Sequence, residues 1–147
     1  MRQIKKLVVH CSDSDDSLDI GVKQIRSWHT MLPPKGNGWS DVGYHYIIRR
    51  DGEIERGRQD ATKGAHVKGH NSDSLGICWV GRKQISTDQL QNLYSLLQGL
   101  MKKYGLQVTD IYGHTELDSK KTCPNLDCNY LRLMTLFHTG EIDSDEI

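Results

Sequence analysis

Residues 74–81 read SLGICWVG, a continuous run of apolar and small side chains. A short run without polar alternation predicts a strand that is buried on both faces, at the centre of a sheet. Residues 4–9 (IKKLVV) and 108–113 (VTDIYG) predict two further strands. Residues 44–57 (YHYIIRRDGEIERG) predict a hairpin, because alternating apolar residues flank an Asp-Gly turn. The chain is therefore expected to be built around a central sheet.

Three segments predict helices around this sheet. Over residues 87–104, leucines recur at spacings of three and four, Ser86 and Gln89 can form a capping box, and Gly105 follows as a stop signal. A second helix is expected over residues 19–32 with Asp19 as its N-cap, and a short third helix over residues 127–138. Strands interspersed with helices indicate the α/β class, with a mostly mixed β-sheet flanked by helices.

Length and composition predict one domain. The 147 residues show no internal repeat and no linker, and 36% of them are hydrophobic, enough for a core. We expect a single domain over residues 1–138 and an acidic, disordered tail over residues 139–147. No apolar run reaches the roughly 18 residues of a membrane span. The formal net charge is zero, so nucleic acid binding is not expected. As a separate expectation, the protein is a monomer.

The N-terminal segment and the cysteines bear on where the protein is made. The apolar run before His10 is too short for a signal peptide. We therefore expect synthesis in the cytoplasm, and any extracellular role would need a separate release route. In a reducing cytosol the four cysteines are expected to be free thiols or metal ligands rather than disulfides.

Two histidines and one cysteine lie where a metal site could form. His10 follows the first predicted strand, His114 follows the last, and Cys123 comes nine residues later in a polar loop. These residue types bind zinc, and three protein ligands leave the fourth position open for catalysis. The alternative is that both histidines are ordinary structural residues and that Cys123 is a small buried side chain.

Four stretches carry a resemblance to a known family. They are VVHCS (8–12), WSDVGYHYIIRRDGEIERGR (39–58), GAHVKGHN (64–71) and YGHTELDSKKTCPN (112–125). In this order they resemble the zinc-dependent N-acetylmuramoyl-L-alanine amidases, above all the small phage lysozymes that are amidases. The peptidoglycan recognition proteins share that fold. The resemblance implies an amidase-like fold, a zinc ion as cofactor, and bacterial peptidoglycan as substrate.

The resemblance also implies roles for individual residues. His10, His114 and Cys123 match the zinc ligands, while Tyr44 and Lys121 match catalytic residues. Lys121 is preferred over its neighbour Lys120 because of its spacing to the cysteine. Zinc would polarise the scissile carbonyl and activate water. Tyr44 and Lys121 would stabilise the oxyanion, and the residue that delivers the proton to the leaving amine stays open.

The other histidines receive less specific assignments. His66 matches a motif that lines the substrate groove and is expected to bind substrate. His29 is expected in the core, and His45 is expected to be structural because it alternates with Tyr44 along the predicted strand. Cys128, five residues after Cys123, is the one other cysteine close enough in sequence to compete as a ligand.

Three functions are compatible with these features. The first is hydrolysis of the amide bond between N-acetylmuramic acid and L-alanine, in bacterial lysis as an endolysin. The second is a non-catalytic peptidoglycan-binding module of the same fold, but such relatives typically lack the cysteine that this chain retains. The third is a thiol hydrolase with Cys123 as nucleophile, although proline directly after this cysteine argues against a helix-activated thiolate.

Overall fold

The computed structural model describes all 147 residues and has five strands and four α-helices. The strands are β1 (Lys6–Cys11), β2 (Tyr46–Ile48), β3 (Ile54–Arg56), β4 (Ser74–Trp79) and β5 (Ile111–Gly113). The helices are α1 (Val22–Thr30), α2 (Thr87–Tyr104), α3 (His114–Leu117) and α4 (Cys128–Phe137). Short 3-10 turns occupy Asn71–Asp73, Val108–Asp110 and Ser144–Glu146.

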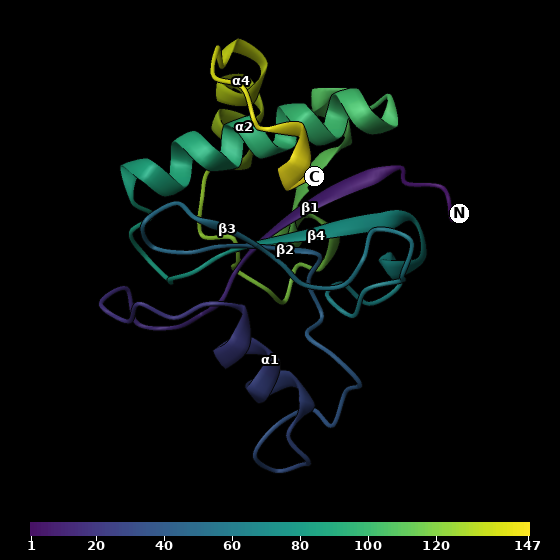
Figure 1. Ribbon diagram of the computed structural model, residues 1–147, viewed down its shortest axis with the longest axis vertical. Coiled ribbons are helices and arrows are strands. Elements are labelled where there is room, and N and C mark those ends of the chain that lie inside the picture. The colour runs from purple at the N-terminus through teal and green to yellow at the C-terminus, as the bar shows by residue number, and fades with distance from the viewer.

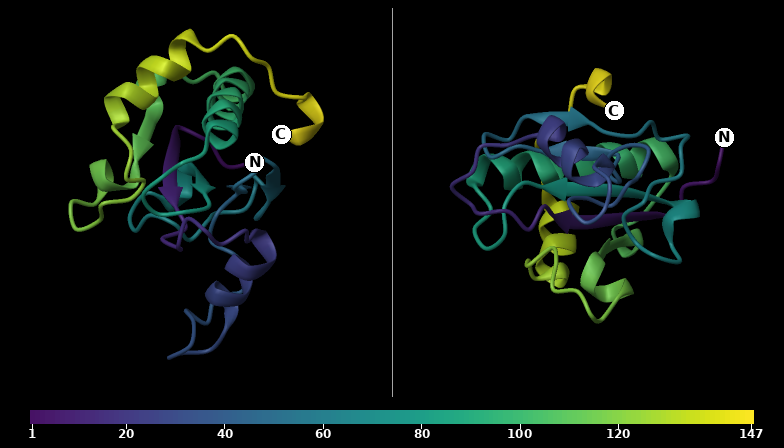
Figure 2. Two further views of the ribbon diagram at one scale, coloured as in Figure 1. Left: turned by 90° about the vertical axis from the view of Figure 1, so that its left-hand side faces the viewer. Right: turned by 90° about the horizontal axis from the view of Figure 1, so that it is seen from below.

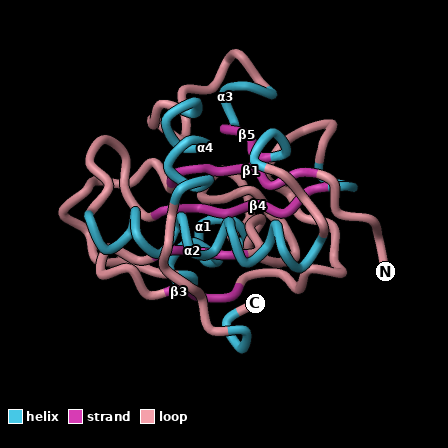
Figure 3. Tube along the Cα trace, turned by 90° about the horizontal axis from the view of Figure 1, so that it is seen from above, coloured by secondary structure: helices cyan, strands magenta, loops and turns pink.

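The strands form one mixed sheet in the order β3-β2-β4-β1-β5, with only the β2–β3 pair antiparallel. Figure 3 shows β3 at one edge of the sheet with β1 and β4 inside it. In Figures 1 and 2, α2 and α4 lie on one side of the sheet and α1 lies on the other. The predicted α/β class and mixed sheet are confirmed, and no helix is both long and apolar enough to cross a membrane.

The central strand is the one that the apolar run predicts. Every residue of β4 is buried, and the strand is paired on both sides. Its side chains alternate: Leu75, Ile77 and Trp79 join the large core beneath α2, while Cys78 joins a smaller core beneath α1. This alternation gives the sheet two different faces. The face away from α2 carries the functional groups described below.

Helix α2 forms where and how the sequence predicts. The Ser86 hydroxyl accepts the Gln89 N–H, the Gln89 side chain accepts the Ser86 N–H, and Gly105 ends the helix at φ 67°. Its buried face includes Leu93, Leu97 and Leu100. Each such leucine contributes about 1.5–3 kcal/mol of burial free energy.

Several predicted boundaries are wrong. Strand β1 covers Lys6–Cys11 rather than residues 4–9, so His10 lies within the strand, and helix α1 ends at Thr30 rather than at residue 32. Helix α1 begins at Val22 rather than at residue 19, because the Glu55 carboxylate accepts the Val22 N–H at 2.9 Å and no side chain of α1 caps it. Asp19 pairs instead with Arg49 at 3.3 Å. The last strand covers only Ile111–Gly113, since β5 pairs with just three residues of β1 and the preceding three form a 3-10 turn.

The acidic C-terminal segment, expected to be disordered, is placed against α2. Ile142 and Ile147 pack against the large core, and the Lys103 ammonium donates to the Ile147 carbonyl. A Cβ atom at Gly99 would lie 2.5 Å from Ile142, so the glycine allows this close approach to the middle of α2. The division into a domain over residues 1–138 and a tail over residues 139–147 stays a prediction.

Candidate active site

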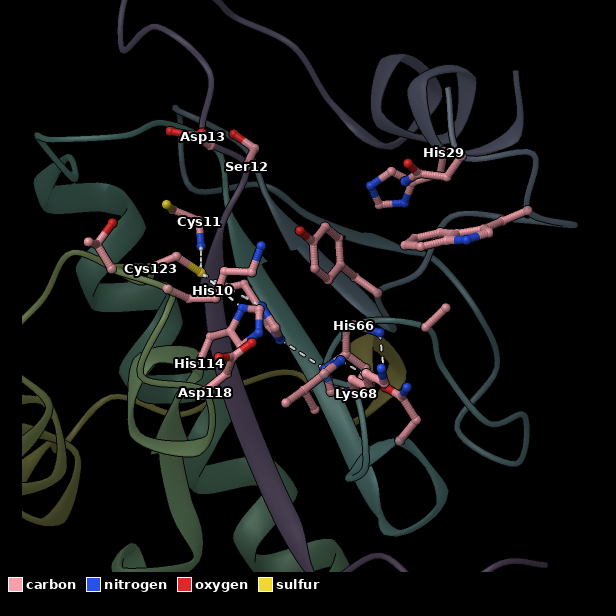
Figure 4. A pocket seen from close by; sticks show the side chains of 18 of the residues that line it. His10, Cys11, Ser12, Asp13, His29, His66, Lys68, His114, Asp118 and Cys123 are labelled. Carbon is pink, nitrogen blue, oxygen red and sulfur yellow. Dashed lines mark hydrogen bonds between the residues drawn. The ribbon is translucent and has the colours of Figure 1, made fainter. Parts of the chain in front are cut away.

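An open groove of about 830 Å³ lies on the sheet face away from α2. Figure 4 shows side chains from several segments converging on it, with His10, His114 and Cys123 gathered at one end and His29 at the other. A groove of this size matches the roughly 300–1,000 Å³ of small-ligand sites. It opens at the carboxyl ends of β1 and β5, where loops from distant parts of the chain meet.

His10 reaches the groove because of its register in β1. Leu7, Val9 and Cys11 point into the large core, so the alternate residue His10 points to the opposite face. Its side chain is only 1% exposed. The Nε2 atom lies 2.8 Å from His66 Nδ1, which leaves Nδ1 directed at His114 and Cys123.

His114 is the first residue of α3, directly after β5. Because Gly113 pairs with Val9 in the sheet, His114 emerges beside His10. The Glu116 carboxylate accepts the Gly113 N–H at 2.9 Å and is itself held by a two-pronged contact with Arg132. These contacts fix the start of α3 and therefore the direction of the imidazole.

Cys123 is held by backbone contacts on both sides. Its carbonyl accepts the Thr115 N–H at 2.8 Å, and the next carbonyl, that of Pro124, accepts the buried Trp79 indole N–H at 3.0 Å. The Cys11 N–H points at the sulfur from 3.4 Å. The loop therefore presents the thiol to the two histidines in a defined position.

The three ligand atoms have the spacing of a metal site. His10 Nδ1 lies 3.1 Å from His114 Nδ1, and Cys123 Sγ lies 3.7 Å from the first and 3.6 Å from the second. A tetrahedral zinc with Zn–N of about 2.0–2.1 Å and Zn–S of about 2.3 Å would separate such atoms by roughly 3.3–3.6 Å. The donor set therefore fits zinc, and no other cluster of three or more candidate ligands occurs.

The pKa values of all three groups are shifted in the direction that favours their uncharged forms. Burial lowers the pKa of His10 well below its ordinary value, and it also lowers the pKa of His114, so both rings are neutral and offer lone pairs. A hydrogen bond with the Cys11 thiol, and then burial, raise the pKa of Cys123. Without a cation this thiol stays protonated and is a poor nucleophile, and a metal ion would bind it as the thiolate, with release of the proton.

Tyr44 and Lys121 both line the groove. Tyr44 precedes β2 rather than starting a strand, and its ring centroid lies 5.1 Å from that of His10. Burial raises the pKa of Tyr44 well above its ordinary value, so the phenol keeps its proton. The Lys121 side chain is exposed, and the backbone N–H of Lys121 donates to the Asp118 carbonyl. Lys120, by contrast, does not line the groove.

His66 lies deeper than a substrate-contacting residue would need to. It lines the groove but is only 8% exposed, and its two ring nitrogens face His10 and Ser74. The Asn71 side-chain oxygen accepts the backbone N–H groups of His66 and Val67 at 2.9 Å each. That His66 binds substrate stays a prediction.

Sequence reasoning missed His29 as a groove residue. Instead of entering the core, its ring lies 5.4 Å from that of Tyr44 and 4.9 Å from that of Trp39, and Nδ1 accepts the Gly43 N–H. A histidine in the last turn of a short helix, ahead of an aromatic loop, was the one available signal. His45 is structural as expected, because it is buried and accepts the Gly76 N–H.

The remaining cysteines lie outside the ligand group. Cys11 and Cys78 are buried. Cys128 begins α4 and directs its thiol at the Leu126 carbonyl, so it does not compete with Cys123. All four cysteines are free thiols.

Comparison with known proteins gives consistent similarities. The family model for N-acetylmuramoyl-L-alanine amidase matches residues 1–126. The endolysin of Escherichia phage T7 is 41% identical over 129 residues, covering 82% of this chain and 80% of that protein. The solved amidase LysC from Clostridium intestinale has a TM-score of 0.78 at 28% identity, covering 90% of this chain and 85% of the other.

A second solved structure has a similar fold. It is the complex of peptidoglycan recognition proteins LCa and LCx with tracheal cytotoxin. The likeness has a TM-score of 0.73 at 24% identity and covers 94% of this chain and 85% of that one. At this level of identity the likeness concerns the fold alone.

Proposed function

Since this chain belongs to the N-acetylmuramoyl-L-alanine amidase family and is a peptidoglycan amidase, we propose that it works through a zinc ion bound by His10, His114 and Cys123. The observation that carries the proposal is the spacing of 3.1–3.7 Å among two imidazole nitrogens and one sulfur. When bound, zinc supplies Lewis acidity toward the scissile carbonyl and lowers the pKa of a water molecule.

Tyr44 would act on the reacting carbonyl. Its hydroxyl keeps its proton because burial raises its pKa, and its ring lies beside His10. A protonated phenol donates a hydrogen bond, so Tyr44 would stabilise the negative charge that develops on the carbonyl oxygen. In this role Tyr44 donates a hydrogen bond and stays uncharged.

Lys121 would supply the second stabilising group. Its ammonium extends from the loop between α3 and Cys123, and its positive charge contributes to lowering the pKa of His114. An ammonium that lines the groove would attract the developing oxyanion, and it has protons to deliver to the leaving amine. Lys120, outside the groove lining, is not expected to contribute.

A non-catalytic binding module is the alternative function of this fold. Such a protein would need the groove but not the ligand triad. Here the three ligand side chains, together with the backbone contacts that hold them, are all present. A thiol hydrolase is disfavoured because the pKa of Cys123 is raised rather than lowered.

The deciding experiment incubates purified protein with peptidoglycan and scores two products separately: newly exposed L-alanine amines and glycan reducing ends. We expect amines without reducing ends, loss of activity with a chelator, and recovery with zinc. Cleavage that ignores the chelator would refute the zinc proposal. Binding to peptidoglycan without cleavage, at saturating zinc, would support the binding module instead.

We further propose that the enzyme acts as a monomer in bacterial lysis, made in the cytoplasm and reaching the wall by a separate release route. The likeness to phage endolysins supports this setting. Expression in bacteria with and without a pore-forming lysis protein tests the route, since lysis should need both. Light scattering of the purified protein should give the mass of one 16.7 kDa chain.

A further inference from the structure

Behind His10 runs a chain of hydrogen bonds that ends on a backbone carbonyl. His10 Nε2 lies 2.8 Å from His66 Nδ1, and His66 Nε2 lies 3.1 Å from Ser74 Oγ. The Ser74 hydroxyl lies 2.7 Å from the His70 carbonyl oxygen. Three side chains from β1, a loop and β4 are thus connected below the floor of the groove.

The carbonyl at the end of the chain sets the direction of every bond in it. A carbonyl oxygen can only accept, so the Ser74 hydroxyl donates its one proton to it. Ser74 Oγ must then accept from His66 Nε2–H, which leaves His66 Nδ1 with a lone pair. That lone pair accepts from His10 Nε2–H. His10 is therefore left with an unprotonated Nδ1, the atom that faces His114 and Cys123.

The surroundings hold the His66 ring in this place. A Cβ atom at Gly76 would lie 2.6 Å from His66 Cγ, and one at Gly64 would lie 2.7 Å from His66 Cδ2. Glycine in the middle of the buried strand β4 thus leaves room for the ring. The Asn71 carboxamide fixes the backbone at His66, as described above. The ring is thus packed closely against the backbone of Gly64 and Gly76.

We propose that His66 is a positioning residue, which fixes the tautomer and the ring orientation of His10 so that Nδ1 binds the metal, with Ser74 as its anchor. The inference rests on the zinc site of the proposed function. It replaces substrate binding as the role of His66, since both ring nitrogens are already engaged within the protein. Partners of this kind typically change metal affinity by about 10–100-fold when they are removed.

Three variants test the role through metal affinity. His66→Phe keeps the ring volume and removes both bonds, while Ser74→Ala removes only the anchor. His66→Gln keeps an acceptor for His10 and should restore part of the loss. The matched control is His138→Phe, because His138 also bonds a serine hydroxyl, Ser95 Oγ at 2.7 Å, but beside α2 and far from the groove.

Zinc affinity is measured by competition with a chromophoric chelator, and thermal unfolding of the metal-free proteins reports folding. We expect His66→Phe to lower zinc affinity by about 10–100-fold, Ser74→Ala by about 10-fold, and the control to leave it unchanged. At saturating zinc, kcat should fall while KM for a muramyl peptide changes less than about two-fold. Nitrogen NMR of the wild type should show His10 and His66 both protonated at Nε2.

Three results would overturn the inference. The first is unchanged zinc affinity in His66→Phe, and the second is a raised KM with normal zinc affinity, which would make His66 a substrate contact. The third is a His66 protonated at Nδ1, a result available even where a variant fails to fold. If the wild type itself bound no zinc and kept its activity with a chelator, the proposed zinc function would fail. That outcome is distinct from the three above, in which the wild type binds zinc and only the role of His66 is refuted.

Discussion

Zinc should stabilise the folded protein through Cys123, and the structure sets the size of the effect. The ligand atoms lie 3.1–3.7 Å apart in one folded site, yet His10 and Cys123 are 113 residues apart in sequence, so only the folded state offers all three. At free zinc 100 times its Kd, binding adds about 2.7 kcal/mol. For a chain of this length that raises Tm by roughly 5–11 °C.

Cys123→Ala removes one of the three ligands. If affinity falls by about 100-fold, the same zinc concentration adds only about 0.4 kcal/mol, and the Tm shift shrinks to roughly 1–2 °C. Thermal unfolding with and without zinc, in the presence of a metal buffer, measures this. Cys128→Ala is the matched control, since this half-buried cysteine lies outside the ligand group and should keep the full shift. An equal zinc shift in Cys123→Ala and wild type would refute the assignment.

Three further predictions concern the groove and the core. Tyr44→Phe should lower kcat by about 10²–10³-fold in steady-state assays while Tm stays within a few degrees, because it removes one oxyanion donor and little volume; an unchanged kcat would exclude that role. Lys121→Ala should reduce kcat by a similar factor and Lys120→Ala should not, and equal losses would contradict the assignment based on the groove lining. Burial lowers the pKa of His45 from 6.5 to about 4. Between those pH values the unfolded chain binds a proton that the folded chain does not, so stability is full above pH 6.5 and falls toward pH 4, by up to about 3 kcal/mol. Urea unfolding across this range should show a flatter profile for His45→Gln, and an identical slope would contradict the prediction.

Much of the fold could be read from local patterns. The buried run over residues 74–81, the Asp-Gly hairpin and the capped helix over residues 87–104 all have local physical causes, and each is found where expected. Boundaries set by distant residues were not predictable. The start of α1 depends on Glu55, which lies more than 30 residues away, and the length of β5 depends on how many residues of β1 it meets.

The metal ligands were named from motifs, but their convergence is a property of the sheet. Because β4, β1 and β5 are parallel neighbours, the ends of β1 and β5 meet at one edge, and this brings His10 beside His114. The choice of Lys121 over Lys120 rested only on the family spacing to Cys123, and spacing does not show which way a loop side chain points. The loop geometry places Lys121 on the groove.

By itself, the sequence determined the α/β class, most helix caps and turns, and the residues of the candidate zinc site, because each of these follows from short-range patterns or from motifs a few residues long. Only the tertiary structure shows which nitrogen of His10 faces His114 and Cys123, why β4 needs a glycine at residue 76, and that both ring nitrogens of His66 are bonded within the protein. These features depend on contacts between residues 8 to 113 positions apart in the chain, and a linear pattern does not record the directions of such contacts.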